Sequence, residues 1–293
     1  MISRLTLGTA QLGLDYGINN VVGKPKKRES LEILKYAHLN NINSIDTASA
    51  YGDSELIVGD FLKKEHAKCY ITSKLESLSK NNVSKKNIER MVYERIEKSA
   101  CNLNVECIDN YLIHDYQDII FYDELIPSLK KVKRDGLIDN LGVSIYTPDE
   151  AEKVIQMDVF DTIQIPLNIF DQRFLNNSLL KRLKKKNYTI FSRSVFLQGL
   201  FFKDRSNLPT NLTPAKNYLI KLDQLAEEKE VTISKLALDF VKSIDEIDSI
   251  VIGVDSLQQL NQNIKDFESN DTLEIDNSAF ANVGETAIDP RKW

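Results

Sequence analysis

Four polar side chains in the first half of the sequence have the chemistry needed to reduce a carbonyl: Asp46, Tyr51, Lys74 and His114. Reduction delivers a hydride to carbon and a proton to oxygen, and an ordinary tyrosine, with a pKa of about 10, is a reluctant acid at neutral pH. An adjacent ammonium such as Lys74 would stabilise the phenolate of Tyr51, and Asp46 would fix and balance the ammonium. His114 would hydrogen-bond the carbonyl oxygen as charge builds there.

Each of these residues taken singly has a structural explanation. An aspartate at a strand end is often a helix cap, a tyrosine is often a packing residue, and a lysine is usually solvated. Their placement is what makes them a candidate site, because each lies at or just after the end of an apolar, strand-like run. Polar groups at the carboxyl ends of parallel strands face one another in a closed barrel.

The elements that would position these groups alternate between short apolar runs and longer amphipathic segments. Strands are predicted at 5–7, 43–46, 69–73, 107–113, 141–144, 162–165, 188–191 and 249–252. Helices are predicted at 30–39, 54–64, 88–103, 125–134, 148–155, 178–186, 219–228, 233–242 and 257–267. Eight βα units predict a (β/α)8 TIM barrel, an α/β fold that forms a single domain over 1–293, with a C-terminal tail at about 270–293.

A doubly wound sheet is the competing architecture. It is disfavoured because the first strand leads into Gly8-Thr9-Ala10-Gln11 and not into the glycine-rich phosphate turn of that fold. Local signals refine the barrel: Ser84 is a candidate cap for the helix at 88, and Thr147 before Pro148 opens the next one. Residues 201–214 are expected to form an extended loop over one barrel end.

Composition narrows the class of protein. Hydrophobic residues make up 42% of the chain, charged residues 28%, and the formal net charge is -5, which disfavours binding to nucleic acid or to an anionic membrane. No run approaches the roughly 20 apolar residues that cross a bilayer. The three cysteines, Cys69, Cys101 and Cys107, form no Cys-x-x-Cys pair, so we expect no metal site, a reducing compartment and a cytoplasmic location.

Three ordered motifs give the chain a family resemblance. The segment from Ile45 to Glu55, with Gly59 beyond it, resembles the aldo-keto reductase signature D-T-A-x-x-Y-G-x-S-E. The runs ending at Lys74 and His114 resemble the strands that carry the catalytic lysine and histidine of that family. The resemblance implies NAD(P)H-dependent reduction of an aldehyde or ketone, with Tyr51 as the proton donor of a tetrad.

The same resemblance implies a set of cofactor-binding residues along the barrel. Gly8 and Thr9 match the opening strand, Ser144 and Gln164 the ligands of the nicotinamide carboxamide, and further positions match later segments. The implied residues are Gly8, Thr9, Ser144, Gln164, Arg193, Ser194, Phe196, Gly253, Asp255, Gln259 and Asn263.

Three positions depart from the family pattern. Ile145 stands where asparagine is usual, and Arg193 stands where an aromatic ring stacks on the nicotinamide. A guanidinium can also stack and would meet an anionic substrate, although it would equally well bridge to a nearby carboxylate. Asp255 lies where the family commonly binds the 2′-phosphate of NADP. The resemblance therefore predicts NADP, while a carboxylate at this position would repel the phosphate and leaves NAD as an alternative.

The substrate is less well specified. The ending from Ile288 to Trp293 resembles tails of bacterial reductases of polysaccharide and modified-sugar synthesis, which predicts a sugar or sugar derivative. Arg193 or Arg291 would then meet a phosphate, and Trp293 would dock at the active-site mouth. Two other classes stay open: a cofactor-binding redox sensor with little turnover, against which the complete tetrad argues, and a non-redox isomerase or lyase. The residues indicate no oligomeric state.

Overall fold

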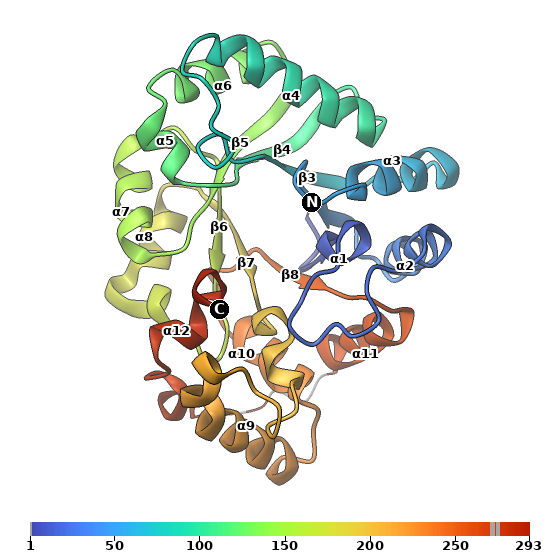
Figure 1. The fold of residues 1–293 in the computed structure, drawn as a ribbon, viewed down its shortest axis with the longest axis vertical. Helices are drawn as coiled ribbons and strands as arrows, with labels where there is room; N and C mark the ends of the chain where they lie inside the picture. Colours follow the sequence, from blue (N-terminus) through green and yellow to red (C-terminus); the bar gives the residue numbers. More distant parts are fainter. Residues whose placement is uncertain (1, 270–272, 274–275) are drawn as a thin grey trace.

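The chain folds into a closed barrel of eight parallel strands, seen in a computed structural model that describes residues 2–269, 273 and 276–293 (Figure 1). Neighbouring strands pair in sequence order, and β8 closes on β1. The strands are β1 (Leu5–Gly8), β2 (Ser44–Asp46), β3 (Tyr70–Leu75), β4 (Ile108–Ile113), β5 (Ile138–Ser144), β6 (Thr162–Pro166), β7 (Thr189–Arg193) and β8 (Ser249–Gly253). The predicted (β/α)8 barrel is confirmed.

Helices surround this barrel and cover the outer faces of the strands (Figure 1). The α-helices are α1 (Ala10–Gly13), α2 (Lys27–Leu39), α3 (Ser54–Glu65), α4 (Ile88–Leu103), α5 (Gln117–Phe121), α6 (Leu125–Arg134), α7 (Pro148–Met157), α8 (Leu179–Lys185), α9 (Lys216–Glu228), α10 (Ile233–Lys242), α11 (Leu257–Glu268) and α12 (Glu285–Ile288). Short 3-10 segments are η1 (Arg173–Ser178), η2 (Leu197–Phe202), η3 (Thr210–Ala215), η4 (Asn277–Phe280) and η5 (Pro290–Lys292).

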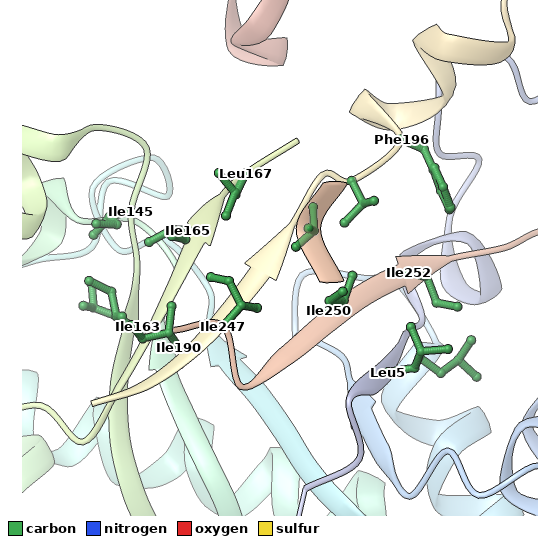
Figure 2. Packing of buried hydrophobic residues seen from close by; sticks show 14 of the residues in the cluster. Leu5, Ile145, Ile163, Ile165, Leu167, Ile190, Phe196, Ile247, Ile250 and Ile252 are labelled. Atoms are coloured by element: carbon green, nitrogen blue, oxygen red, sulfur yellow. The ribbon is translucent and has the colours of Figure 1, made fainter. Parts of the chain in front are cut away.

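The strands are buried on both faces, as parallel strands in a barrel must be. Figure 2 shows Ile163, Ile190 and Ile250 on the adjacent strands β6, β7 and β8, and all three are fully buried. Polar residues inside the barrel pair with one another: the Thr6 hydroxyl donates to Ser44 Oγ at 2.8 Å and lies 2.7 Å from Ser249 Oγ. The barrel interior is therefore a packed core, with its open end left for the site.

One predicted helix start is confirmed and one is wrong. Thr147 caps α7, since its hydroxyl accepts from the Glu150 amide and the Glu150 side chain accepts from the Thr147 amide. Ser84 does not cap α4. The chain turns at Asn87 with a φ of 64°, which makes Asn87 the N-cap, and the Ser84 hydroxyl accepts instead from the Lys86 amide.

The predicted loop at 201–214 contains the end of η2 and most of η3, with irregular chain between them.

The tail beyond α11 folds over the loops that follow the strands. Phe280 stacks on Phe170, with ring centroids 5.6 Å apart, and the Tyr218 hydroxyl donates to the Asn282 carbonyl. Residues 270–272 and 274–275 of the predicted tail lie outside the described residues, and the boundary at about 270 stays a prediction. Within the described ranges, no helix combines the length and apolar character needed to span a membrane.

Candidate active site

A cavity of about 580 Å³ opens where the strands end. Strands β1, β2, β5, β7 and β8 each deliver their last residue to its wall: Gly8, Asp46, Ser144, Arg193 and Gly253. All the residues predicted to bind the cofactor line this one cavity: Gly8, Thr9, Ser144, Gln164, Arg193, Ser194, Phe196, Gly253, Asp255, Gln259 and Asn263. Of the predicted tetrad, Asp46, Tyr51 and His114 line it, and Lys74 lies buried beneath them.

Lys74 and Asp46 form a buried ion pair on the neighbouring strands β3 and β2. Lys74 Nζ lies 2.5 Å from Asp46 Oδ1 and donates to the Thr47 carbonyl at 3.0 Å, and its side chain is 1% exposed. Gln164 reaches across the barrel from β6, and its Nε2 donates to Asp46 Oδ2 at 2.7 Å. Burial lowers the pKa of Lys74 and the charge of Asp46 raises it. Both Asp46 oxygens are therefore held by hydrogen bonds.

Tyr51 lies directly above this pair, in the turn after β2. Lys74 Nζ is 5.1 Å from the centroid of its ring, and the His114 ring meets it edge-on at 5.6 Å between centroids. Burial and then the Asp46 carboxylate raise the pKa of Tyr51, while Arg193 lowers it. This direction is opposite to the one we expected from an adjacent ammonium. The phenol therefore keeps its proton at neutral pH and is a weaker acid than an ordinary tyrosine.

The Tyr51 turn is held by two glycines that approach each other closely. A Cβ on Gly13, at the end of α1, would lie 1.8 Å from the Tyr51 carbonyl oxygen. Gly52 has a φ of +57°, and a Cβ there would lie 2.4 Å from the Gly13 carbonyl oxygen. Neither position has room for a side chain, so α1 fits directly against the turn that carries the phenol.

His114 follows β4 and lies beside Tyr51 in the cavity wall. Burial lowers the pKa of His114 to about 3, with further lowering from the charges of Lys74 and Arg193. The imidazole is consequently neutral at physiological pH. A neutral ring carries one N–H donor, which is the form that hydrogen-bonds a carbonyl oxygen without competing as an acid.

Arg193, at the end of β7, makes no ion pair with any carboxylate of the described chain. Its Nη2 donates to the Ile145 carbonyl at 3.0 Å and its Nη1 to Ser194 Oγ at 3.2 Å. Its guanidinium carbon lies 4.2 Å from the centroid of the Tyr146 ring. The alternative in which Arg193 bridges to a carboxylate is therefore wrong. Ile145 itself is fully buried and contributes only its carbonyl.

The opposite end of the cavity is built by the loop after β8. Ser256 caps α11 by accepting from the Gln259 amide, and Gln259 Oε1 accepts from the Asp255 amide at 3.1 Å. Burial raises the pKa of Asp255. A Cβ on Gly253 would lie 2.5 Å from the side-chain amide of Gln11, which would have to move to make room. In the described part of the chain, Arg193 is the one lysine or arginine on the cavity wall, so this end carries no basic side chain.

The structure adds cavity residues that the sequence did not single out. Tyr16 and Tyr146 line the site, and burial raises the pKa of Tyr16. The loop carrying Tyr16 is joined to the loop after β7, because the Ile18 amide donates to the Gln198 carbonyl at 3.0 Å. No motif marks these residues, since each reaches the cavity only through contacts between distant segments.

The C-terminal tail reaches the rim of the site through Arg291. Its guanidinium carbon lies 3.7 Å from the Tyr146 ring centroid, and the same guanidinium pairs with the buried Asp289. Trp293, which we expected at the mouth, packs partly buried against the core and donates from its indole to the Thr286 carbonyl. The tail therefore meets the cavity wall through the contact of Arg291 with Tyr146, and Trp293, which was expected at the mouth, does not line the cavity. The described residues contain no cluster of three metal-binding side chains.

Comparison with known proteins supports the geometry. The profile of the Aldo/keto reductase family matches residues 4–282. The chain belongs to this family. It is an NAD(P)-dependent oxidoreductase, as members of the family are.

Two curated relatives and one solved structure cover most of the chain. The NADH-specific methylglyoxal reductase of Escherichia coli is 26% identical, over 90% of this chain and 89% of its own. The L-galactose dehydrogenase of Arabidopsis thaliana is 24% identical, over 99% of this chain and 92% of its own. The structure of a glycerol dehydrogenase from Gluconobacter oxydans is 26% identical, with a TM-score of 0.70 over 95% of this chain and 89% of that one.

Proposed function

We propose that this aldo-keto reductase reduces the carbonyl of a sugar or sugar derivative, with Tyr51 as the proton donor. The observation that carries the proposal is the stack formed by the buried Lys74–Asp46 pair, the protonated Tyr51 phenol above it and the neutral His114 beside it. A carbonyl oxygen in the cavity would meet a phenol O–H and an imidazole N–H together. That pairing both supplies the proton and stabilises the charge that develops on oxygen.

The residues present fit a nicotinamide dinucleotide. The cavity volume of about 580 Å³ is within the usual range for cofactor sites, and helix α11 begins at its far end. Ser144 and Gln164 would hold the carboxamide, while Gly253, Gln259 and Asn263 would hold the adenosine part. When bound, the reduced cofactor supplies the hydride, and the chain's own residues orient the carbonyl and deliver the proton.

We infer that NADH is used in preference to NADPH, although family habit predicted NADP. Asp255 lines the end of the cavity that would hold the adenosine part. Asp255, with no lysine or arginine beside it among the described residues of this wall, disfavours a 2′-phosphate and suits a ribose hydroxyl. The E. coli relative is named as NADH-specific.

The polar wall beside the tetrad supports a hydroxylated substrate. Tyr16, Asn19, Asn20, Tyr146 and Gln198 all line the cavity near the strand ends. Side chains of these types form hydrogen bonds with hydroxyl groups in both directions. The names of two relatives, an L-galactose dehydrogenase and a glycerol dehydrogenase, refer to hydroxylated compounds of this class.

The test is a steady-state panel in which the absorbance of NADH or NADPH is followed with aldoses, ketoses, their phosphates and simple alkyl aldehydes. We expect turnover of sugar carbonyls with NADH, at higher kcat/KM than for alkyl aldehydes of similar size. Binding of cofactor without consumption across the panel would contradict reduction and support a redox sensor. Absence of cofactor binding, measured by NADH fluorescence, would contradict it in favour of an isomerase or lyase.

A further inference from the structure

Among the described residues, Arg193 is a cation in the wall of the reaction cavity that has no carboxylate partner. We propose that it binds an anionic group of the substrate, a carboxylate or a phosphate, and that Tyr146 and the tail residue Arg291 hold it in place for this purpose. The inference rests on the proposed function, since it names the class of carbonyl compound that the same site takes. The substrate would be an oxo compound that carries its own negative charge, such as an acidic or phosphorylated sugar.

The charges in this half of the cavity leave Arg193 unbalanced. Lys74 is neutralised by Asp46 at 2.5 Å, and His114 is uncharged at physiological pH. Asp255 is on the loop after β8, where it accepts no hydrogen bond from Arg193. One net positive charge therefore faces the space beside Tyr51. A partly buried, unpaired cation is costly, and an anion bound against it would offset that cost.

The guanidinium of Arg193 also has N–H donors that bond no acceptor among the described residues. It carries five N–H groups, and its contacts within the described chain are the Ile145 carbonyl and the Ser194 hydroxyl. Those two bonds fix the plane of the group against the Tyr146 ring, 4.2 Å away. The remaining N–H groups can meet the paired oxygens of a carboxylate or phosphate, which is the recognition that a planar guanidinium does best.

Tyr146 is anchored on several sides, which makes it a stable platform. Its amide donates to Glu150 Oε2 at 2.7 Å and its carbonyl accepts from Arg173 Nη2 at 3.2 Å. Arg291 covers the same ring at 3.7 Å, and its charge is offset by the buried Asp289. Arg291 is thus a positioning residue. The tail takes part in the site by fixing the ring on which Arg193 lies.

The anion could instead be the diphosphate of the cofactor, and this rival makes a different prediction. A residue that serves the cofactor changes the dissociation constant of NADH when it is replaced. A residue that serves a substrate anion changes the ratio of kcat/KM between charged and neutral carbonyls. The experiment therefore measures both quantities on the same variants.

Matched substrates isolate the charge: glyceraldehyde 3-phosphate against glyceraldehyde, and succinic semialdehyde against butanal. With NADH, we expect the wild-type chain to favour the anionic member of at least one pair by about tenfold or more. Arg193→Gln should bring that ratio near one, Arg193→Lys should restore part of it, and Arg291→Gln should lower it less, mainly through KM. Arg182→Gln, which removes an exposed pair with Glu152, is the control and should leave the ratio unchanged. A preference for glyceraldehyde 3-phosphate would identify the bound group as a phosphate, and a preference for succinic semialdehyde would identify it as a carboxylate.

An unchanged charged-to-neutral ratio in Arg193→Gln would overturn the inference, and so would a loss of NADH affinity without a change in the ratio. If no carbonyl is reduced at all, the proposed function fails on its own. Calorimetric binding of inorganic phosphate and of succinate to the NADH complex then still decides the inference. Binding that Arg193→Gln abolishes supports it, and binding that Arg193→Gln leaves intact, or no binding to the wild-type chain, overturns it. Thermal melts confirm that each variant is folded.

Discussion

The first four strands and the last four contribute differently to the same cavity. Strands β2 to β4 and the turn after β2 supply the tetrad, in which the one strong pair of opposite charges is buried and mutually neutralised. Strands β5 to β8 and the loops after them supply the three residues that depart from the family pattern, and the two charges among these, Arg193 and Asp255, are not paired with each other or with the tetrad. Paired charges fix the geometry of the side chains that carry them, and unpaired charges remain available for a ligand.

This contrast separates two kinds of mutational effect. Replacements in the first half should change the rate of reduction and the stability of the fold, because they break contacts that are already complete. Replacements in the second half should change which cofactor or substrate is chosen, with little cost to folding.

Breaking the buried pair should be the most damaging change. Asp46→Asn removes the counter-charge of Lys74, whose side chain is 1% exposed, and Lys74→Met does the reverse. Removal of one partner of a buried pair typically costs about 3–5 kcal/mol. We expect each single variant to lose that order of unfolding free energy in urea titrations, and the double variant to lose clearly less than the sum. Additive losses would show that the two charges are not coupled.

Removing the charge of Asp255 should change cofactor choice and leave stability intact. Asp255→Asn keeps the size of the side chain and removes the repulsion of a 2′-phosphate. We expect the ratio of kcat/KM for NADH over NADPH to fall by about tenfold, which corresponds to about 1.4 kcal/mol. Asp245→Asn, on an exposed loop, is the matched control. If Asp255→Asn leaves the ratio of kcat/KM for NADH over NADPH unchanged, the 2′ position of the ribose does not lie near Asp255.

The smallest effect concerns stability in acid. The pKa of His114 is about 3 in the folded chain, and the ordinary histidine pKa is near 6.5. Between these two pH values the unfolded state binds a proton at this histidine and the folded state does not. Stability is therefore lost as pH falls from about 6.5 towards 3. Glutamine cannot take up that proton, so the fall in Tm from pH 7 to pH 5 should be about 2–4 °C smaller in His114→Gln. The exposed His66→Gln should follow the wild type.

Local patterns predicted most of the fold. Helices α4, α6 and α10 begin and end at the predicted residues because their amphipathic period is set within each segment. The cap of α4 was missed because it depends on a left-handed turn at Asn87, to which the position of Ser84 gives no guide. Strand ends were sufficient to place Asp46, Lys74 and His114 around one site, because a closed barrel brings all its strand ends together. The cytoplasmic location stays a prediction.

The contacts that define selectivity were not predictable from local sequence. Gln164 meets Asp46 from across the barrel, and Arg291 meets Tyr146 from the far end of the chain. The direction of the Tyr51 pKa shift was also missed, because it depends on how deeply the fold buries the phenol and on its distance from Asp46. Motifs indicate which groups can react, while packing between distant segments decides their charge and their partners.

Tyr51→Phe shows whether Tyr51 gives the proton. The replacement removes only the hydroxyl and keeps the ring that lies over Lys74 and against His114. We expect a loss in kcat of about 10²–10⁴-fold, with the dissociation constant of NADH within about twofold of the wild-type value and an unchanged Tm. Retention of kcat, or a parallel loss of cofactor affinity and folding, would contradict it.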